Sequence, residues 1–255
     1  MKKIYFFIVI GILFLFSGGV FPQDKTVIIS IDSSKVHWTF SLKAEGSYQK
    51  GNTNKIFGLS EGEIKRTGDS LLESILKAKL TYGESDDIKD ENELSSSFTM
   101  DLFYENKFSP FFLQLTSFNF GREIDLRSQS GFGLKYTFVN IPEIKASISA
   151  AGIYDYTNLR ERTGNSDSKT WRLSMRLKFK SSVFGGRINI THYTYYQPSF
   201  KDFKNAIWMS ESELSFPLTE FLFVTSTYSY THEDVVPAGV KKDDHKLTFG
   251  LKISF

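Results

Sequence analysis

Apolar and polar side chains alternate along most of this chain, most regularly in the last nine residues. Leu247, Phe249, Leu251, Ile253 and Phe255 are apolar, whereas the residues between them are small or polar. Successive side chains of a β-strand point to opposite faces, so this alternation predicts a strand with one apolar and one polar face.

The same pattern recurs along the chain and predicts about twelve strands. The expected strands cover residues 36–49, 55–66, 72–82, 94–105, 111–121, 129–138, 144–156, 171–179, 184–197, 206–216, 220–232 and 246–255. The clearest is 171–179, in which Trp171 and Leu173 alternate with Arg172 and Ser174. Residues 71–80 fit a helix less well than a strand, so we predict an all-β chain.

The expected connections alternate between tight and long. Tight turns are expected at 67–70, 106–110, 140–143, 180–183 and 217–219, and longer loops at 84–93, 121–128, 158–169, 198–205 and 233–245. Short turns at one end and long loops at the other are typical of an up-and-down antiparallel transmembrane barrel, with the short side in the periplasm. A soluble β-sandwich is the alternative, but it does not predict this asymmetry. Closure would also remove the exposed edges of so long a sheet.

The N-terminus predicts export. Met1, Lys2 and Lys3 precede an apolar run over 4–16 and the small residues 17–19. A run this short is typical of a cleaved signal peptide rather than of a membrane-spanning helix. We expect a signal peptide over 1–23, with cleavage after Gly19 or nearer Gln23, then a periplasmic leader over 24–35 and a barrel over 36–255.

Composition is consistent with that prediction. Aromatic residues make up 16% of the chain, with 25 Phe and 12 Tyr, and such residues suit strands and membrane-interface girdles. No cysteine is present, which excludes a lipid-anchored cysteine, a disulfide framework and a thiolate metal site. The 31 basic side chains exceed the 29 acidic ones by Lys2 and Lys3 alone, so the mature chain is formally neutral. This balance argues against nucleic acid as a partner.

The last strand resembles the closing strand of bacterial outer-membrane barrels. In those proteins a glycine, an apolar residue and a final aromatic residue, here Gly250, Ile253 and Phe255, form the signal read by the barrel-assembly machinery. We expect this strand to pair with 36–49, with Phe249, Leu251, Ile253 and Phe255 facing lipid and Lys252 facing the lumen.

Three stretches resemble the DUF481 family of Gram-negative outer-membrane proteins, which includes proteins labelled salt-induced outer membrane protein. They are Lys50-Gly51-Asn52-Thr53, the segment 120–136 and the end from Pro237 to Phe255. The resemblance implies a bacterial outer-membrane barrel in contact with lipid and lipopolysaccharide. It implies no established activity.

The polar phase of the strands would line the lumen with charges of both signs. The candidates are Lys43, Glu45, Glu73, Lys77, Lys79, Asp101, Glu105, Lys135, Arg172, Arg176, Arg187, Glu211, Glu213 and Lys252. Opposed acidic and basic walls would create a field that orients a solute in a selective pore. Alternatively, salt bridges between these charges close the lumen, because confined charges must pair or stay hydrated.

Gly131 and Gly133 would lie together on the inner face. They are expected to make room for a bulky neighbour such as Phe118 or Phe120, or to curve the strand. The fifth strand carries aromatic residues in both phases, which predicts an aromatic side chain inside the barrel. It would pack against the glycines or form an aromatic patch that binds sugar or lipid.

Two further groups could carry chemistry. His192 lies among tyrosines and could serve as the base of a lipid-modifying enzyme, although the sequence shows no His-x-Ser pair; a histidine at the membrane interface is the simpler interpretation. If the last two strands form a hairpin, a six-residue group meets at the outer rim and could bind a divalent cation, or could simply be solvated. The group is His232, Glu233, Asp234, Asp243, Asp244 and His245.

We therefore expect an outer-membrane barrel with a narrow or gated passage for small polar solutes. The main alternative is a non-conducting barrel with a structural or adhesive role for its outer loops. Enzymatic activity is not expected, nor is a cofactor or a bound metal.

Overall fold

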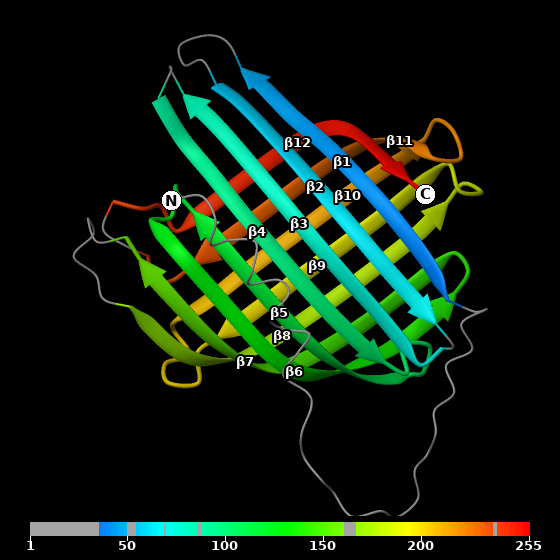
Figure 1. Ribbon diagram of the computed structural model, residues 1–255, viewed down its shortest axis with the longest axis horizontal. Helices are drawn as coiled ribbons and strands as arrows, with labels where there is room; N and C mark the ends of the chain where they lie inside the picture. Colours follow the sequence, from blue (N-terminus) through cyan, green and yellow to red (C-terminus); the bar gives the residue numbers. More distant parts are fainter. Residues whose placement is uncertain (1–35, 50–54, 69, 86–87, 161–166, 237–238) are drawn as a thin grey trace, which may run out of the picture. The chain divides into compact units, whose positions relative to one another are not determined.

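Twelve antiparallel strands close into one barrel in a computed structural model that describes residues 36–49, 55–68, 70–85, 88–160, 167–236 and 239–255. Each strand pairs with its neighbours in sequence, and β1 also pairs with β12, so the predicted closed up-and-down barrel is confirmed (Figure 1). The expected signal peptide (1–23) and leader (24–35) lie outside the described residues.

The strands follow one another without a crossover. Their bounds are β1 His37–Gln49, β2 Lys55–Gly68, β3 Leu72–Ser85, β4 Ile88–Leu102, β5 Phe108–Asn119, β6 Ile124–Ile141, β7 Ile144–Leu159, β8 Ser168–Val183, β9 Ile188–Pro198, β10 Ala206–Pro217, β11 Leu222–Glu233 and β12 Asp243–Ser254.

The apolar phase of each strand forms the outer surface. Phe132 is 73% exposed and Leu42 is 67% exposed, although both are large apolar side chains. The polar phase points inward, where Lys43 and Asp155 are buried. This inversion of the usual soluble pattern gives a transmembrane barrel, whose outer band contacts lipid and whose interior is polar. Among the described residues, no helix is long and apolar enough to span a membrane.

The two ends of the barrel differ, and we name them by their connections. The turn end holds the connections 69–71, 103–107, 142–143, 184–187 and 218–221, together with the start of β1 and the end of β12; the loop end holds 50–54, 86–87, 120–123, 160–167, 199–205 and 234–242.

Two expected turns are displaced along the chain. The turn predicted at 106–110 occupies 103–107, and the one predicted at 180–183 occupies 184–187. Phe103 and Phe184 adopt left-handed φ angles of 52° and 54°, and Gly185 and Gly186 follow at 66° and 89°. Left-handed backbone ends strand pairing, and alternation alone does not reveal where it falls.

The acidic loop expected at 84–93 is largely strand. β3 continues to Ser85 and β4 begins at Ile88, so this connection is one of the shortest in the barrel. Similarly, the loop expected at 121–128 shrinks to 120–123. Backbone hydrogen bonds pair strands whatever their side chains, so polar sequence does not end a hairpin that extends beyond the apolar band.

The seam between β1 and β12 is fixed by Glu45 and Gly250, which face each other in the register. A Cβ atom on Gly250 would overlap the carbonyl oxygen of Ala44 and lie 2.6 Å from Glu45 Cα. The absent side chain lets the β1 backbone at Ala44 and Glu45 approach β12 closely. Its buried carboxylate accepts hydrogen bonds from Thr225, Thr227 and Thr248, whose Oγ1 atoms lie 2.7, 2.8 and 2.7 Å away.

Phe255 completes the seam. Its backbone N–H donates to the Phe40 carbonyl, and the Phe40 N–H donates to the Phe255 carbonyl, at 2.9 and 3.0 Å. Its ring stacks on Phe221, with centroids 6.1 Å apart. Phe249, Leu251, Ile253 and Phe255 all lie on the outer face, between 36% and 74% exposed.

An apolar cluster occupies part of the lumen along β5 to β7. Phe111 and Ile153 are buried there with Ala151, and Leu113 packs against them. A Cβ on Gly133 would lie 2.6 Å from Phe111 Cζ, so the glycine makes room for this ring. The expected inward aromatic residue therefore exists, but it is Phe111. Phe118 and Phe120 were the wrong choices. Phe118 pairs with Leu94, which is 51% exposed on the outer face, and Phe120 is the first residue of the 120–123 connection at the loop end.

Closure predicts unusual resistance to detergent. Unboiled protein should migrate differently from boiled protein on a denaturing gel, because a barrel without free edges keeps its backbone hydrogen bonds in detergent. Identical mobility of the two samples would contradict a closed barrel.

Gly250→Ala should prevent closure or strongly lower the folded fraction, because the new methyl group meets backbone atoms of β1 that cannot rotate away. Gly152→Ala is the matched control, since a Cβ at Gly152 meets no atom within 4 Å. The folded fraction is measured by gel mobility after refolding into detergent. Equal folded fractions for the two variants would show that the seam tolerates a side chain at this position.

Candidate functional site

Most of the expected lumen residues lie on inward positions of the strands. Register and alternation place twelve of the fourteen candidates on this face. They are Lys43, Glu45, Glu73, Lys77, Lys79, Asp101, Lys135, Arg172, Arg176, Glu211, Glu213 and Lys252. The other two candidates, Glu105 and Arg187, do not lie on the inner face. Both are exposed in connections at the turn end, 103–107 and 184–187, because the turns are displaced from their expected positions.

Near the seam, inward-facing residues of opposite charge form ion pairs, and some of them contact more than one partner. Glu213 on β10 lies 3.0 Å from Lys43 Nζ and 3.2 Å from Lys252 Nζ. Lys43 also lies 3.8 Å from Glu45. Because Lys43 and Glu45 are buried, this pairing keeps their charges compensated inside the barrel.

A second group of ion pairs involves β2 and β3. Lys77 Nζ lies 2.7 Å from Glu63 and 3.7 Å from Glu61, on the neighbouring strand. Lys79 lies 3.8 Å from Glu211 on β10, a contact that crosses the lumen. The remaining pairs of this kind are Lys65 with Glu73 and Lys135 with Asp101.

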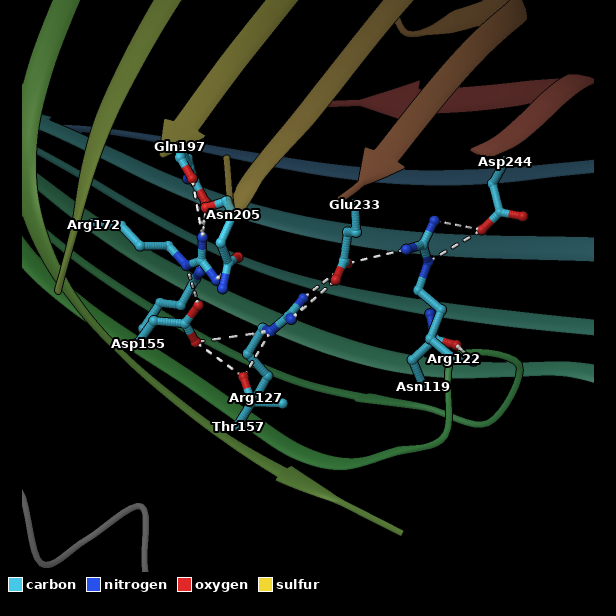
Figure 2. Close-up of polar contacts among 11 residues, drawn as sticks. Asn119, Arg122, Arg127, Asp155, Thr157, Arg172, Gln197, Asn205, Glu233 and Asp244 are labelled. Atoms are coloured by element: carbon cyan, nitrogen blue, oxygen red, sulfur yellow. Dashed lines mark hydrogen bonds and ion pairs between the residues drawn. The ribbon is translucent and has the colours of Figure 1, made fainter. Parts of the chain in front are cut away.

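At the loop end, six charged residues form a continuous set of contacts, which we call the mouth network (Figure 2). Its members are Arg122, Arg127, Asp155, Arg172, Glu233 and Asp244. Three are basic and three acidic, so their charges balance.

The mouth network crosses the lumen through Glu233. Its carboxylate accepts two hydrogen bonds from Arg127, at 3.0 and 3.2 Å, and lies 3.1 Å from Arg122 Nη1. Arg122 also donates to Asp244 from Nε at 3.1 Å and Nη2 at 2.7 Å. Four strands separate β6, which carries Arg127, from β11, which carries Glu233. The contacts therefore join distant parts of the wall.

The other half of the mouth network runs along the wall. Arg172 donates from Nε to Asp155 at 2.8 Å, and its Nη1 donates to the backbone carbonyls of Gln197 and Asn205 at 3.1 and 2.9 Å. Asp155 lies 3.8 Å from Arg127 Nε, which connects the two halves. Arg172 is thus fixed to the 199–205 connection, as Figure 2 shows.

Below the mouth network lies a cavity of about 420 Å³. Polar and charged side chains supply much of its lining, with Leu113 and Ile153 of the apolar cluster on one side. A volume of this size can hold a small organic molecule. The lumen is therefore neither a wide open pore nor a fully packed core.

One wall of this cavity carries the basic side chains of Arg176 and Lys178 on β8, and Lys180 follows at the next alternate position, outside the cavity toward the turn end. Within the described strands, none of these three residues has an acidic group within ion-pair distance. Arg176 and Lys178 lie instead 5.9 and 5.6 Å from the ring centroids of Tyr195 and Tyr193 on β9. Cations at such distances are attracted to the ring face.

His192 lies on the outer face of β9. Its Nδ1 and Nε2 each lie 2.8 Å from a hydroxyl oxygen, Ser212 Oγ and Thr194 Oγ1 respectively. Ser212 is opposite His192 in the register of β9 and β10. The sequence concealed this His–Ser contact, because register rather than spacing along the chain creates it. Hydroxyl groups at both ring nitrogens explain how a histidine is accommodated on this surface.

The six residues proposed to converge on a metal ion do not form one group. Strand alternation sends Glu233 and Asp244 into the mouth network, whereas His232 contacts Asp243 at 2.8 Å and Asp234 at 3.3 Å on the outer side. In the described part of the chain, no three His, Asp or Glu side chains are placed to hold a metal. The hypothesis of a rim metal site was wrong because it ignored the two faces of the hairpin.

Asp234, in the connection after β11, has a lowered pKa. Partial desolvation acts in the opposite direction, but hydrogen bonds from the Ala206 backbone N–H and from His232 favour the ionised carboxylate. This residue therefore fixes the start of β10 to the end of β11 at the loop end.

Sequence reasoning identified only Arg172 of the mouth network as a lumen residue. Arg122 and Arg127 were hidden because 121–128 was expected to be a loop, and Glu233 and Asp244 were expected at the outer rim. Strand phase could have identified Asp155, which already lay in the inward phase of its strand. The partners of Arg122 and Arg127 could not be found, because their contacts with Asp244 and Glu233 join residues more than 100 positions apart.

Comparison with solved structures identifies barrels of the porin class. The NanC porin is 9% identical and covers 84% of this chain and 98% of its own, with a TM-score of 0.53. The KdgM porin in complex with disordered oligogalacturonate is 8% identical and covers 84% and 99%, with a TM-score of 0.47. The outer membrane channel DcaP of Acinetobacter baumannii is 8% identical and covers 86% and 97%, with a TM-score of 0.45. At these identities the likeness to NanC extends to the fold alone.

NanC and KdgM are described as porins, and DcaP as an outer membrane channel. No curated protein sequence matches the chain. A family model described as "Protein of unknown function, DUF481" matches residues 29–255, which include every strand of the barrel. The chain therefore belongs to the DUF481 family.

Proposed function

We propose that this protein is an outer-membrane channel for small polar solutes that is closed at its loop end by the mouth network. The observation that carries the proposal is the cavity of about 420 Å³, lined by both charged and apolar side chains, directly below a set of ion pairs that crosses the lumen. The cavity offers space for a solute, and the ion pairs obstruct its access from the loop end.

The mouth network is placed where movement could open it. Arg122 belongs to the 120–123 connection, and Glu233 and Asp244 flank the 234–242 connection. Connections at strand ends have fewer backbone hydrogen bonds than the barrel wall, so they can move while the wall stays closed. Displacing the 120–123 connection separates Arg122 from Glu233 and Asp244 without breaking a pair of strands.

The same proposal includes a location and an assembly route. The exposed apolar band suits the outer membrane, with the turn end in the periplasm and the loop end in contact with lipopolysaccharide. Export would use the expected signal peptide. Gly250, Ile253 and Phe255 lie at the seam, where the barrel-assembly machinery would complete closure.

A non-conducting barrel is the second candidate, because the ion pairs cross the lumen at more than one level. Besides the mouth network, Lys79 reaches Glu211 from the opposite wall. In that case the exposed loops would carry a structural or adhesive role. Neither candidate includes a catalytic step.

Glu233→Gln should increase opening of the channel. The substitution keeps the shape of the side chain but removes the charge that both Arg122 and Arg127 contact. A hydrogen bond to a charged group contributes about 1.5–3 kcal/mol, so the ratio of open to closed time should rise by roughly tenfold or more. Single-channel recording of purified protein in planar bilayers measures this ratio.

Asp125→Asn is the matched control. Asp125 lies at the same end and pairs with Arg160 at 3.2 Å, but its side chain is 44% exposed and outside the mouth network. Its recordings should match those of the wild type. If folded wild-type and Glu233→Gln barrels are both silent, the channel proposal fails and the non-conducting barrel is favoured.

A further inference from the structure

We infer that the lumen binds organic anions, carrying a carboxylate or phosphate on a sugar or similar ring, along a basic track formed by β8 and β9. The basic track consists of Arg176, Lys178, Lys180, Tyr193 and Tyr195. This inference rests on the proposed function, in which solutes occupy the cavity, and it names their chemical class.

The first argument is the uneven pairing of charge inside the barrel. Lys43, Lys77 and Lys252 each lie within 3.2 Å of a carboxylate. The three basic residues of the track have no acidic group within ion-pair distance in the described residues, although carboxylates are plentiful on the opposite wall. Those carboxylates, on β2 and β10, are already engaged by other lysines. The β8 wall therefore carries a row of positive charges that no carboxylate compensates.

The second argument is the spacing of these charges. Arg176, Lys178 and Lys180 occupy alternate positions of one strand, so their Cα atoms are roughly 6.6–7 Å apart along the same face. Three like charges at this spacing repel one another unless water or an anion compensates them. A solute with one or more anionic groups would be stabilised at each step along the wall. Toward the loop end, the same face of β8 continues with Ser174 and then Arg172, which belongs to the mouth network.

The third argument is the aromatic surface beside the charges. Lys178 pairs in register with Tyr193, and Arg176 pairs with Tyr195. Both tyrosines line the cavity together with both basic residues. The Arg176 guanidinium also lies 5.7 Å from the Phe111 ring, so it is held between two aromatic rings.

Together these features select the ligand class. Basic groups bind carboxylate or phosphate, and guanidinium in particular presents several donors to such groups. Tyrosine rings offer a flat apolar face and a hydroxyl group, which suit the face of a sugar ring. A neutral sugar would lack the charge contact, and a simple inorganic anion would lack the ring contact.

The test uses folded barrel in detergent and three probes: glucuronate, glucose 6-phosphate and glucose. Titration calorimetry should detect binding of at least one of the two anions and weaker or no binding of glucose. The double variant Lys178→Gln with Lys180→Gln should bind the anion roughly tenfold more weakly, which corresponds to about 1.4 kcal/mol. Comparison of the two anions distinguishes carboxylate from phosphate recognition.

The paired substitution Lys201→Gln with Lys204→Gln is the matched control, because it makes the same charge change at two exposed positions of the 199–205 connection outside the cavity. Its affinity should equal that of the wild type. The double variant should also fold normally, since it leaves no carboxylate without its partner; unboiled gel mobility verifies this.

Failure of the inference is distinguishable from failure of the channel proposal. If folded wild type binds neither anion, or if the double variant binds as tightly as wild type, the basic track is not an anion site. In bilayers with a salt gradient, the same variant should shift the reversal potential toward cation selectivity. A barrel that is silent in bilayers but binds anions through Lys178 and Lys180 would retain the site and lose the channel.

Discussion

Backbone hydrogen bonds between β1 and β12 are the constraint on which the rest of this structure depends. A sheet in a membrane has no water to satisfy its edges, so every strand must find a partner on both sides. At the seam, Glu45 of β1 and Gly250 of β12 face each other in the register and make this pairing possible. The glycine lets the two backbones approach, and the Glu45 carboxylate accepts hydrogen bonds from three threonine hydroxyl groups. Closure of the wall and composition of the lumen are thus set by the same pair of residues.

Closure turns the polar phase of twelve strands into a confined interior, where charge cannot remain uncompensated without cost. Lys43 and Glu213 illustrate the usual solution, a short ion pair between inward-facing side chains. The apolar cluster around Phe111 is another solution, because it fills part of the lumen without any charge. The β8 wall follows neither. Its basic side chains contact tyrosine rings rather than carboxylates, and for this reason we interpret it as a binding surface rather than as a structural element.

The distribution of these contacts along the barrel axis links stability to function. Ion pairs near the seam join residues held in strand backbone, so they stabilise the wall. The mouth network instead includes contacts that join strand residues to connections, through Arg122 at 120–123 and through Asn205 at 199–205. Contacts of the second kind can break while the strands remain paired. A rigid wall with a movable closure at one end is the arrangement that a gated passage requires.

The sequence by itself determined the architecture of this protein. Alternation in segments such as 171–179 and 247–255 reveals both the strands and which face of each is apolar, because side-chain direction in a strand depends only on position along the chain. The inward position of Lys43, Arg176 and Glu213 follows from the same rule. Family membership could also be predicted, from the glycine and aromatic pattern of 120–136 and of the last strand.

Only the tertiary structure decided where turns fall and which inward residues meet. Glu105 and Arg187 left the lumen because left-handed residues moved two turns by a few positions, and alternation carries no signal for backbone handedness. The link from Arg127 to Glu233 depends on which strands face each other across the barrel, and the contact of His192 with Ser212 depends on the register between β9 and β10. Pairing across a closed lumen is a property of the whole ring of strands, so no local stretch of sequence contains it.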